Sequence, residues 1–150
     1  IPTTGFLFRE KRKPRNIVSE KIKEFNLSIP EIKAAKRGDD LVRFDGITIK
    51  NIDITNDPQP ASSYAFCSDT IYDESLIPYI EDVDLLYHEA TYLHDLQHKA
   101  LQRGHATARD AALIAEKANV KHLVLGHYSS RYRNVEAFRD EAEPIFLLSH

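Results

Sequence analysis

The segment Val83–Thr91, with the sequence VDLLYHEAT, decides the fold because its apolar run leads directly into a polar cluster. The same pattern occurs in Tyr64–Thr70 (YAFCSDT) and in His122–Arg131 (HLVLGHYSSR). Short apolar runs that alternate along the chain with segments of helical periodicity are typical of parallel strands joined by helical crossovers. In an open α/β sheet, ligands bind where the carboxyl ends of the strands meet the loops. We therefore expect an α/β fold that carries one edge of an active site.

The stretches between these runs predict the connecting helices. Thr107 and Asp110 have the spacing of a capping box, followed by an apolar, alanine-rich run that ends near Asn119. Pro78 interrupts the stretch from Asp73 to Asp82, so any helix there must be short or kinked. The pattern from residue 64 onward is thus strand, helix, strand, helix, strand.

The first sixty residues follow a different pattern. A strand is expected over Pro2–Phe8, and the two-proline stretch Asn56–Pro60 is typical of a linker. Between them the spacing predicts two short helices and a hairpin with a type I′ turn at Asp-Gly, over residues 17–25, 29–37 and 41–50. We expect these elements to share little hydrophobic core. We therefore expect three parts: a core strand over 1–8, a protruding arm over 9–60, and the main domain over 61–150.

Composition bounds the class of protein. The chain has 150 residues, of which 42% are hydrophobic and 29% charged, so it can form one globular core. Its single cysteine, Cys67, excludes an internal disulfide and fits a reducing compartment. No apolar run reaches the ~18–20 residues of a membrane span, and no signal segment opens the chain. The sequence indicates a cytoplasmic protein, and the first residue, Ile1, with no methionine anywhere, indicates a fragment.

The net charge of −3 hides an asymmetry. Residues 9–43 hold eleven Lys or Arg against six Asp or Glu, a net charge of +5, which leaves −8 on the remainder. A basic segment attached to an acidic body indicates a surface that holds a polyanion. The alternative is a solvated surface arm, and charge alone does not separate the two.

Several polar residues at the predicted loop positions have two readings each. Asp69 can bridge metal ions or cap a helix, and His127 can be a metal ligand or a plain loop histidine. Glu89 can orient a histidine or move a proton, and His105, just before a helix N-terminus, suits a scissile phosphate. A competing metal pair is His94 with His98, four residues apart on a helix.

A complete zinc site usually needs three or four protein ligands, and the two candidates at the strand ends fall short of that number. The sequence contains no H-x-H-x-D-H and no H-E-x-x-H pattern. The rest of the site is therefore expected outside this chain.

Taken together, the motifs are far more specific. The ordered set CSDT, HEAT, GHATA and GHYSSRY resembles the C-terminal half of ribonuclease Z, the tRNA 3′-processing endonuclease of the metallo-β-lactamase superfamily. The resemblance runs over essentially the whole chain and includes the family's flexible arm. It implies the C-terminal half of a metallo-β-lactamase αββα sandwich with a small helix and hairpin arm.

The resemblance also implies residue roles. Asp69 would bridge two zinc ions and His127 would be the last metal ligand. His105 would protonate the leaving oxygen or steady the phosphate, with Glu89 as its partner. Ala106 stands where the family has a serine, and the H-x-H-x-D-H motif would lie upstream of Ile1.

The substrate implied is precursor tRNA, cut by a homodimer that uses two zinc ions per complete site. Phosphate binding near the reaction is expected from Ser129, Ser130 and Arg131. Backbone contacts in the arm are expected from Lys11, Arg12, Lys13 and Arg15. Two alternatives stay open: a metal-dependent hydrolase of a small phosphodiester or thioester, and a non-catalytic RNA-binding fragment.

Overall fold

A computed structural model of the chain describes residues 3–147. The chain forms two compact units. The core unit consists of Ile1–Glu10 together with Ser62–His150, and the arm unit is Lys11–Ala61. Each unit has its own hydrophobic cluster, so each is described by itself.

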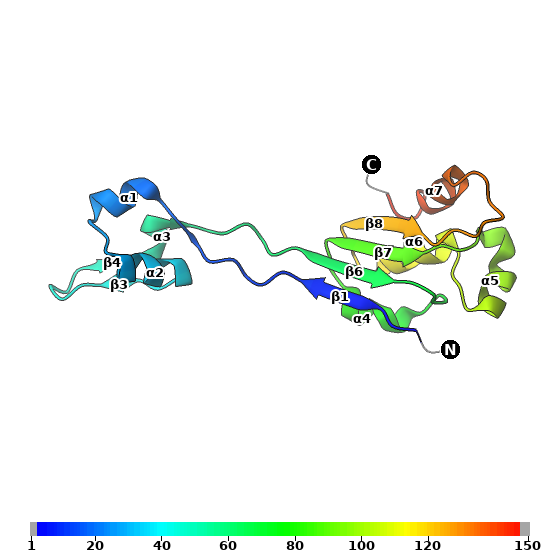
Figure 1. The fold of residues 1–150 in the computed structure, drawn as a ribbon, viewed down its shortest axis with the longest axis horizontal. Coiled ribbons are helices and arrows are strands. Elements are labelled where there is room, and N and C mark those ends of the chain that lie inside the picture. The colour runs from blue at the N-terminus through cyan, green and yellow to red at the C-terminus, as the bar shows by residue number, and fades with distance from the viewer. Residues whose placement is uncertain (1–2, 148–150) are drawn as a thin grey trace. The chain divides into compact units, whose positions relative to one another are not determined.

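The core unit is built on a four-stranded sheet with the order β1-β6-β7-β8 (Figure 1). The strands are β1 (Phe6–Arg9), β6 (Ser63–Cys67), β7 (Leu85–Glu89) and β8 (His122–Gly126). Strands β6, β7 and β8 run parallel, which confirms the predicted crossover pattern, and β1 pairs antiparallel with β6. The first strand begins later than expected, and Pro2 lies outside the described residues.

The helices of the core unit follow the predicted caps. Helix α6 (Ala108–Lys117) begins with the capping box, in which Thr107 and Asp110 bond each other's backbone amides. The helical stretch around Pro78 is short, as expected, with a 3₁₀ turn before a single α-helical turn. The remaining elements are η1 (Glu74–Leu76), α4 (Ile77–Ile80), η2 (His94–Leu96), α5 (Gln97–Arg103) and α7 (Glu136–Ala142).

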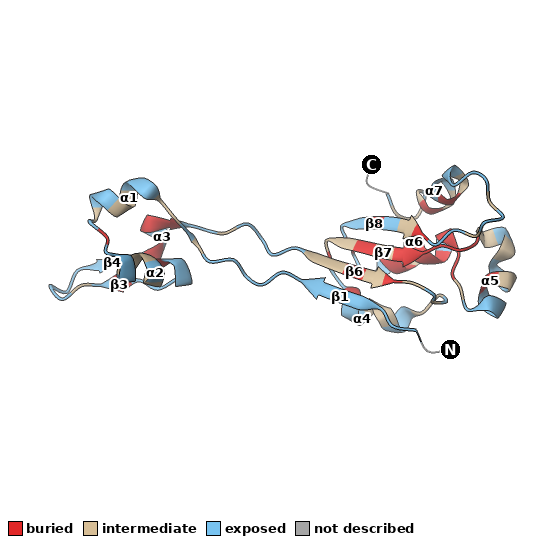
Figure 2. Ribbon diagram, viewed as in Figure 1, coloured by how far each residue is buried: buried red, intermediate tan, exposed pale blue. Residues whose placement is uncertain are grey.

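One face of the sheet forms the core. Alternate residues of the strands, such as Ala65, Leu86 and Leu123, point toward α6 and are at least nine-tenths buried. Within the core unit, Figure 2 shows much of β7 and α6 in the buried colour. Small alanines on α6 let the helix approach the sheet closely, because alternating strand side chains fill the space between them.

The opposite face of the sheet carries aromatic rings. Phe8 stacks on Tyr64, and Phe66 stacks on Tyr87 with 4.7 Å between ring centroids. Phe6 and Phe8 are more than half exposed, and Val124 on β8 is 44% exposed. Within the described chain, this face is therefore open to solvent.

The arm unit contains three short helices and two small ladders. Strand β2 pairs antiparallel with β5, and β3 pairs antiparallel with β4. The predicted helix over 29–37 is confirmed, and the one predicted over 17–25 is shorter because a strand precedes it. The elements are β2 (Asn16–Ile17), α1 (Ser19–Glu24), α2 (Ile29–Arg37), β3 (Leu41–Val42), β4 (Thr48–Ile49), α3 (Asn51–Ile54) and β5 (Thr55–Asn56).

The expectation of little shared core in the arm was wrong. Leu27, Ala35, Leu41, Ile49 and Ile54 form a buried cluster, which partly buried residues of α1 and α2 surround. The sequence hides this cluster because three of its members, Leu41, Ile49 and Ile54, lie in elements only two to four residues long.

A buried amide closes the arm around this cluster. The Asn51 side chain donates to the carbonyl oxygens of Ala35 (2.7 Å) and Asp39 (3.0 Å). Its side-chain oxygen accepts from Thr55 (2.9 Å), and its backbone amide donates to Asp40 (2.7 Å). Asn51 thus connects α2, the hairpin and β5.

The hairpin turn also differs from the prediction. A type I′ turn needs positive φ at both Asp45 and Gly46, whereas only Gly46 has it, at 84°. The amide of Gly46 donates to the carbonyl of Arg43, and the amide of Arg43 to that of Ile47. The loop is therefore a longer one in which glycine takes the left-handed position, a common alternative for three-residue hairpins.

No helix within residues 3–147 combines the length and the apolar character needed to cross a membrane.

Candidate metal and phosphodiester site

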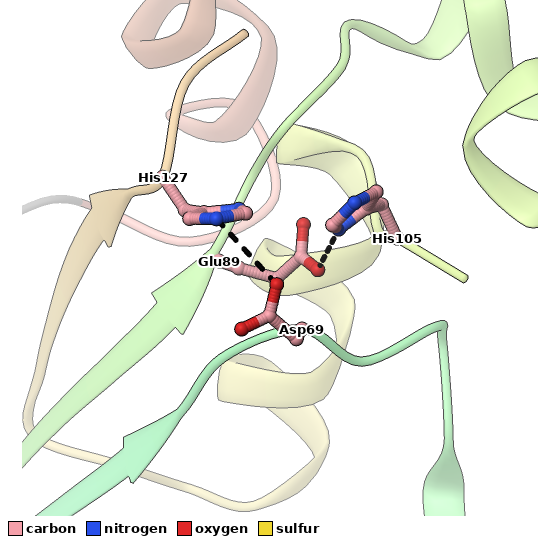
Figure 3. A group of neighbouring side chains, drawn as sticks. All are labelled: Asp69, Glu89, His105 and His127. Carbon is pink, nitrogen blue, oxygen red and sulfur yellow. Dashed lines mark hydrogen bonds and ion pairs between the residues drawn. The ribbon is translucent and has the colours of Figure 1, made fainter. Parts of the chain in front are cut away.

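The polar clusters lie together at the carboxyl ends of the parallel strands. Asp69 lies two residues beyond β6, Glu89 is the last residue of β7, and His127 directly follows β8. His105 comes from the loop before α6. One ligand atom of each of these four side chains lies within 4.8 Å of the others (Figure 3).

Glu89 is the centre of this group and is fully buried. Its Oε1 accepts from the amide of Thr70 (3.0 Å) and contacts Nδ1 of His105 (2.7 Å). Its Oε2 accepts from the hydroxyl and amide of Thr91 (2.6 and 3.1 Å) and from the amide of Ala106 (3.1 Å). Five contacts use the lone pairs that a carboxylate offers. Glu89 therefore positions its neighbours and has no lone pair left for a metal ion.

His105 is held by this carboxylate in one orientation. Because the Glu89 oxygen is an acceptor, Nδ1 of His105 carries the proton that the two share. The backbone amide of His105 donates to the carbonyl of Ala100, which attaches the loop to α5. The side chain stays 21% exposed, so Nε2 is the nitrogen that can exchange a proton with a ligand.

Asp69 and His127 are the exposed members of the group, at 53% and 42% of their side-chain surfaces. Both have a left-handed backbone, with φ of 51° and 62°. This conformation costs a non-glycine residue about 1–2 kcal/mol, and such strain is concentrated at functional sites. The fold therefore holds these two side chains in place at a cost to its own stability.

The pair fits a shared metal ion. Oδ1 of Asp69 and Nε2 of His127 are 3.5 Å apart, too far for a good hydrogen bond. Two ligands bound at ~2.0–2.1 Å around a tetrahedral ion lie about 3.4 Å apart, which is close to this separation. Carboxylate oxygen and imidazole nitrogen are also ligands that Zn²⁺ accepts.

The loop after β8 brings the predicted phosphate-binding residues to the same end of the sheet. The guanidinium of Arg131 lies 5.0 Å from the ring centre of Tyr92, and its Nε donates to the Ser129 hydroxyl (3.2 Å). Tyr92 in turn lies beside His105, with 6.3 Å between the ring centres. Ser130 is exposed on the same loop. Cation–π stacking of this kind holds a guanidinium in place while its outer N–H groups stay available.

Other candidate groups near the site have internal roles. Burial lowers the pKa of His88 below its ordinary value, and its Nδ1–H donates to the carbonyl of Glu89 (2.8 Å). Burial also raises the pKa of the Cys67 thiol, which keeps it protonated and a poor ligand. Within residues 3–147, His94 and His98 join no group of three metal-binding side chains, so the competing pair gains no support.

The four cations predicted for RNA contact lie in the arm unit. Arg12, Lys13 and Arg15 line a hollow of about 570 Å³, together with Lys36 and Arg37 at the end of α2. Arg15 is partly committed to the arm itself, because its guanidinium bonds the Thr55 hydroxyl (2.7 Å) and pairs with Asp57. Lys11 is exposed.

Sequence reasoning missed two members of the site. The Thr91 hydroxyl contacts both Glu89 and Nδ1 of His127 (2.8 Å), and the Tyr92 ring supports Arg131. Thr91 is the last residue of the predicted HEAT cluster, where no role is predicted for it, and Tyr92 directly follows it. Their polar character next to Glu89 is the one signal that could have identified them.

Comparisons with known proteins identify the relatives of this chain. It is 44% identical over 146 residues to ribonuclease Z of Parabacteroides distasonis, covering 97% of this chain and 48% of that protein. It is 42% identical over 148 residues to ribonuclease Z of Cytophaga hutchinsonii, covering 97% of this chain and 47% of that protein. These matches confirm the resemblance to ribonuclease Z. The chain spans about half the length of these curated relatives.

A solved structure supports the fold. The metallo-β-lactamase fold protein YhfI of Bacillus subtilis aligns with a TM-score of 0.52 and 27% identity, over 58% of this chain and 35% of that one. The predicted metallo-β-lactamase fold is thereby confirmed. Comparison with models of protein families gave no match.

Proposed function

Because the chain is similar to ribonuclease Z over nearly its whole length, we propose that it forms part of a zinc-dependent endoribonuclease. The substrate would be precursor tRNA, cut at its 3′ end to remove the trailer. The observation that carries the proposal is the pair of buried Glu89 and partly exposed His105, with ligand atoms within 4.8 Å of those of Asp69 and His127. A proton donor beside two metal-binding side chains is the arrangement that phosphodiester hydrolysis needs.

Asp69 and His127 would hold the metal, with Asp69 as the bridging carboxylate. Zinc ions, when bound, would polarise the phosphate and lower the pKa of water from ~15.7 toward ~7. Relatives twice as long as this chain support the further proposal that the remaining ligands lie elsewhere in the complete protein. In that case the 150-residue chain should lose zinc on dialysis, whereas the complete protein should retain it, as elemental analysis can measure.

His105 would act as the general acid. Glu89 fixes its Nδ1–H and stabilises the charged ring, so that Nε2 can pass a proton to the departing 3′ oxygen. The following helix N-terminus favours the negative charge of the phosphate. Arg131, stacked on Tyr92, and the hydroxyls of Ser129 and Ser130 would hold the phosphate oxygens.

The experiment that tests this assignment compares two variants of the complete protein. His105→Ala should lower kcat by about 10²–10⁴-fold and keep its zinc, since general acid catalysis has that magnitude. His127→Ala should instead lose zinc. Zinc content and single-turnover rates measure both effects. Loss of zinc by His105→Ala with retention by His127→Ala would show that the two roles have been exchanged.

The arm would bind the RNA backbone. Replacing Lys11, Arg12 and Lys13 by alanine should weaken binding of precursor tRNA and reduce its salt dependence by about 0.7–0.9 in slope per lost phosphate contact. Hydrolysis of a small phosphodiester should not change. Arg15→Ala is kept as a separate variant, because its contacts with Thr55 and Asp57 also support the arm. Equal losses on both substrates would contradict RNA binding by the arm.

The proposal also includes a cytoplasmic homodimer. The buried, reduced Cys67 agrees with a reducing compartment. Sedimentation of the complete protein at several concentrations tests the homodimer. A monomer at every concentration would contradict it.

A further inference from the structure

The Thr91 hydroxyl lies between the buried carboxylate and the exposed histidine. Its Oγ1 is 2.6 Å from Oε2 of Glu89 and 2.8 Å from Nδ1 of His127. Thr91 itself is 93% buried, so no competing solvent is expected at this hydroxyl. A hydroxyl has one proton to give and two lone pairs to offer. The direction of each bond can therefore be worked out.

Oε2 of Glu89 already accepts two backbone amide protons, from Thr91 and Ala106, both at 3.1 Å. Such an oxygen is an acceptor, so the Thr91 hydroxyl must donate its proton to it. The hydroxyl can then only accept from His127, which means that Nδ1 of His127 carries the ring proton. A neutral ring has one N–H, so Nε2 keeps its lone pair. Nε2 is the nitrogen that faces Asp69.

Backbone bonds keep this geometry in place independently of the hydroxyl. The amide of Ser129 donates to the carbonyl of Thr91 (3.1 Å), and the amide of Ala90 donates to that of Gly126 (2.8 Å). These two bonds hold the backbone at Gly126, just before His127, and at Ser129, two residues after it. Removing the hydroxyl should therefore leave the loop attached while the ring loses its partner.

We propose that Thr91 is a positioning residue that fixes His127 in the Nδ1–H tautomer and so keeps Nε2 ready to bind a metal ion. The metal part of this inference rests on the proposed function, whereas the tautomer is a property of the chain itself. Glu89 then controls both histidines. Oε1 orients His105 directly, and Oε2 orients His127 through Thr91.

The test is the tautomer of His127 in the 150-residue chain. Long-range ¹H–¹⁵N correlation spectra, recorded near pH 8, where an ordinary imidazole is neutral, report which ring nitrogen carries the proton. The wild-type chain and Thr91→Ser should show Nδ1–H. Thr91→Val, which keeps the shape and loses the hydroxyl, should show Nε2–H or a mixture, and Thr91→Ala should agree with it.

His88 provides an internal control, because its Nδ1–H bond to the Glu89 carbonyl does not involve the hydroxyl. Its pattern should be the same in all four proteins and reports that the fold is intact. The wild-type spectrum alone can overturn the proposal, if it shows Nε2–H for His127. An unchanged Nδ1–H pattern in Thr91→Val with His88 intact would overturn it as well.

A second measurement separates this inference from the proposed function. In the complete protein, Zn²⁺ affinity should fall by about 10–100-fold in Thr91→Val and recover in Thr91→Ser, the usual effect of removing a partner of a metal-binding histidine. A tautomer change with unchanged zinc affinity would leave the Thr91 relay standing and overturn the metal role of His127.

Discussion

The core unit and the arm unit are each organised around one buried polar side chain, but the two side chains serve different partners. Glu89 bonds groups that lead outward, to His105 directly and to His127 through Thr91. Asn51 bonds inward, to the backbone carbonyls of Ala35 and Asp39. Both satisfy the rule that a buried polar group needs partners. Only Glu89 orients partly exposed rings, those of His105 and His127.

This difference predicts what each group is for. A buried group that donates hydrogen bonds to backbone carbonyls takes over the bonds that water made to them in the unfolded chain, and so stabilises the fold. A buried group that orients exposed side chains gives up stabilising contacts to hold reactive atoms in place. Substitution of Asn51 should therefore affect stability, whereas substitution of Glu89 should affect the chemistry.

The largest expected effect is at Glu89. In Glu89→Gln, the new NH2 group replaces one oxygen and must face either the two donors at Oε1, which include His105, or the three at Oε2, which include the Thr91 hydroxyl. It therefore disturbs either His105 or the Thr91 relay. We expect kcat in the complete protein to fall by about 10²–10⁴-fold, the magnitude of general acid catalysis. Single-turnover rates measure it. Glu31→Gln, which removes a capping carboxylate in the arm, is the matched control and should leave the rate unchanged. Similar rates for the two variants would show that Glu89 has no special role in the reaction.

The next effect is in the arm. Asn51→Ala leaves the Asp39 carbonyl without its donor and removes one of the two donors of the Ala35 carbonyl, which keeps the Gly38 amide. It should destabilise the arm unit by about 1–3 kcal/mol. Hydrogen exchange should show lost protection within Lys11–Ala61 and unchanged protection in the core unit. Asn134→Ala, at an exposed asparagine, is the control. Loss of protection across both units would show that they unfold together.

In the core unit, a pH effect is expected from His88. Burial lowers the pKa of His88, so the folded state binds this proton less readily than the unfolded state. Stability should then be full above the ordinary value near 6.5 and fall as the pH drops below it, by at most about 1.4 kcal/mol per pH unit. Urea unfolding between about pH 5 and 7.5 measures the slope. His88→Asn cannot titrate, and a slope unchanged in that variant would assign the effect elsewhere.

The smallest effect concerns backbone strain at the exposed end of the site. With φ of 62° at residue 127, His127→Gly should be more stable than His127→Ala by about 1 kcal/mol. At residue 105, where the backbone is not left-handed, the order should reverse. Thermal unfolding of the four variants checks this. The same order at both positions would contradict the strain assigned to His127.

Local signals explain which features could be predicted from the sequence. The parallel strands, the capping box at Thr107 and the polar residues at strand ends follow from patterns a few residues long. The role of Thr91 depends on His127, 36 residues away, and that of Asn51 on Ala35, 16 residues away. Helix α3 has only four residues, too few for a periodic pattern. Contacts of this kind exist only once the chain has folded.

The pairing of β2 with β5 has a consequence for the speed of folding. Strands β1 and β6 must find each other across more than fifty intervening residues, which makes their meeting entropically costly. Once Asn16 pairs with Asn56, the loop still to be closed shrinks to about a dozen residues, and the closure cost falls by about 1 kcal/mol. An arm that folds early would thus accelerate closure of the sheet by several-fold. The inserted segment would then act as a folding aid for the strand that precedes it.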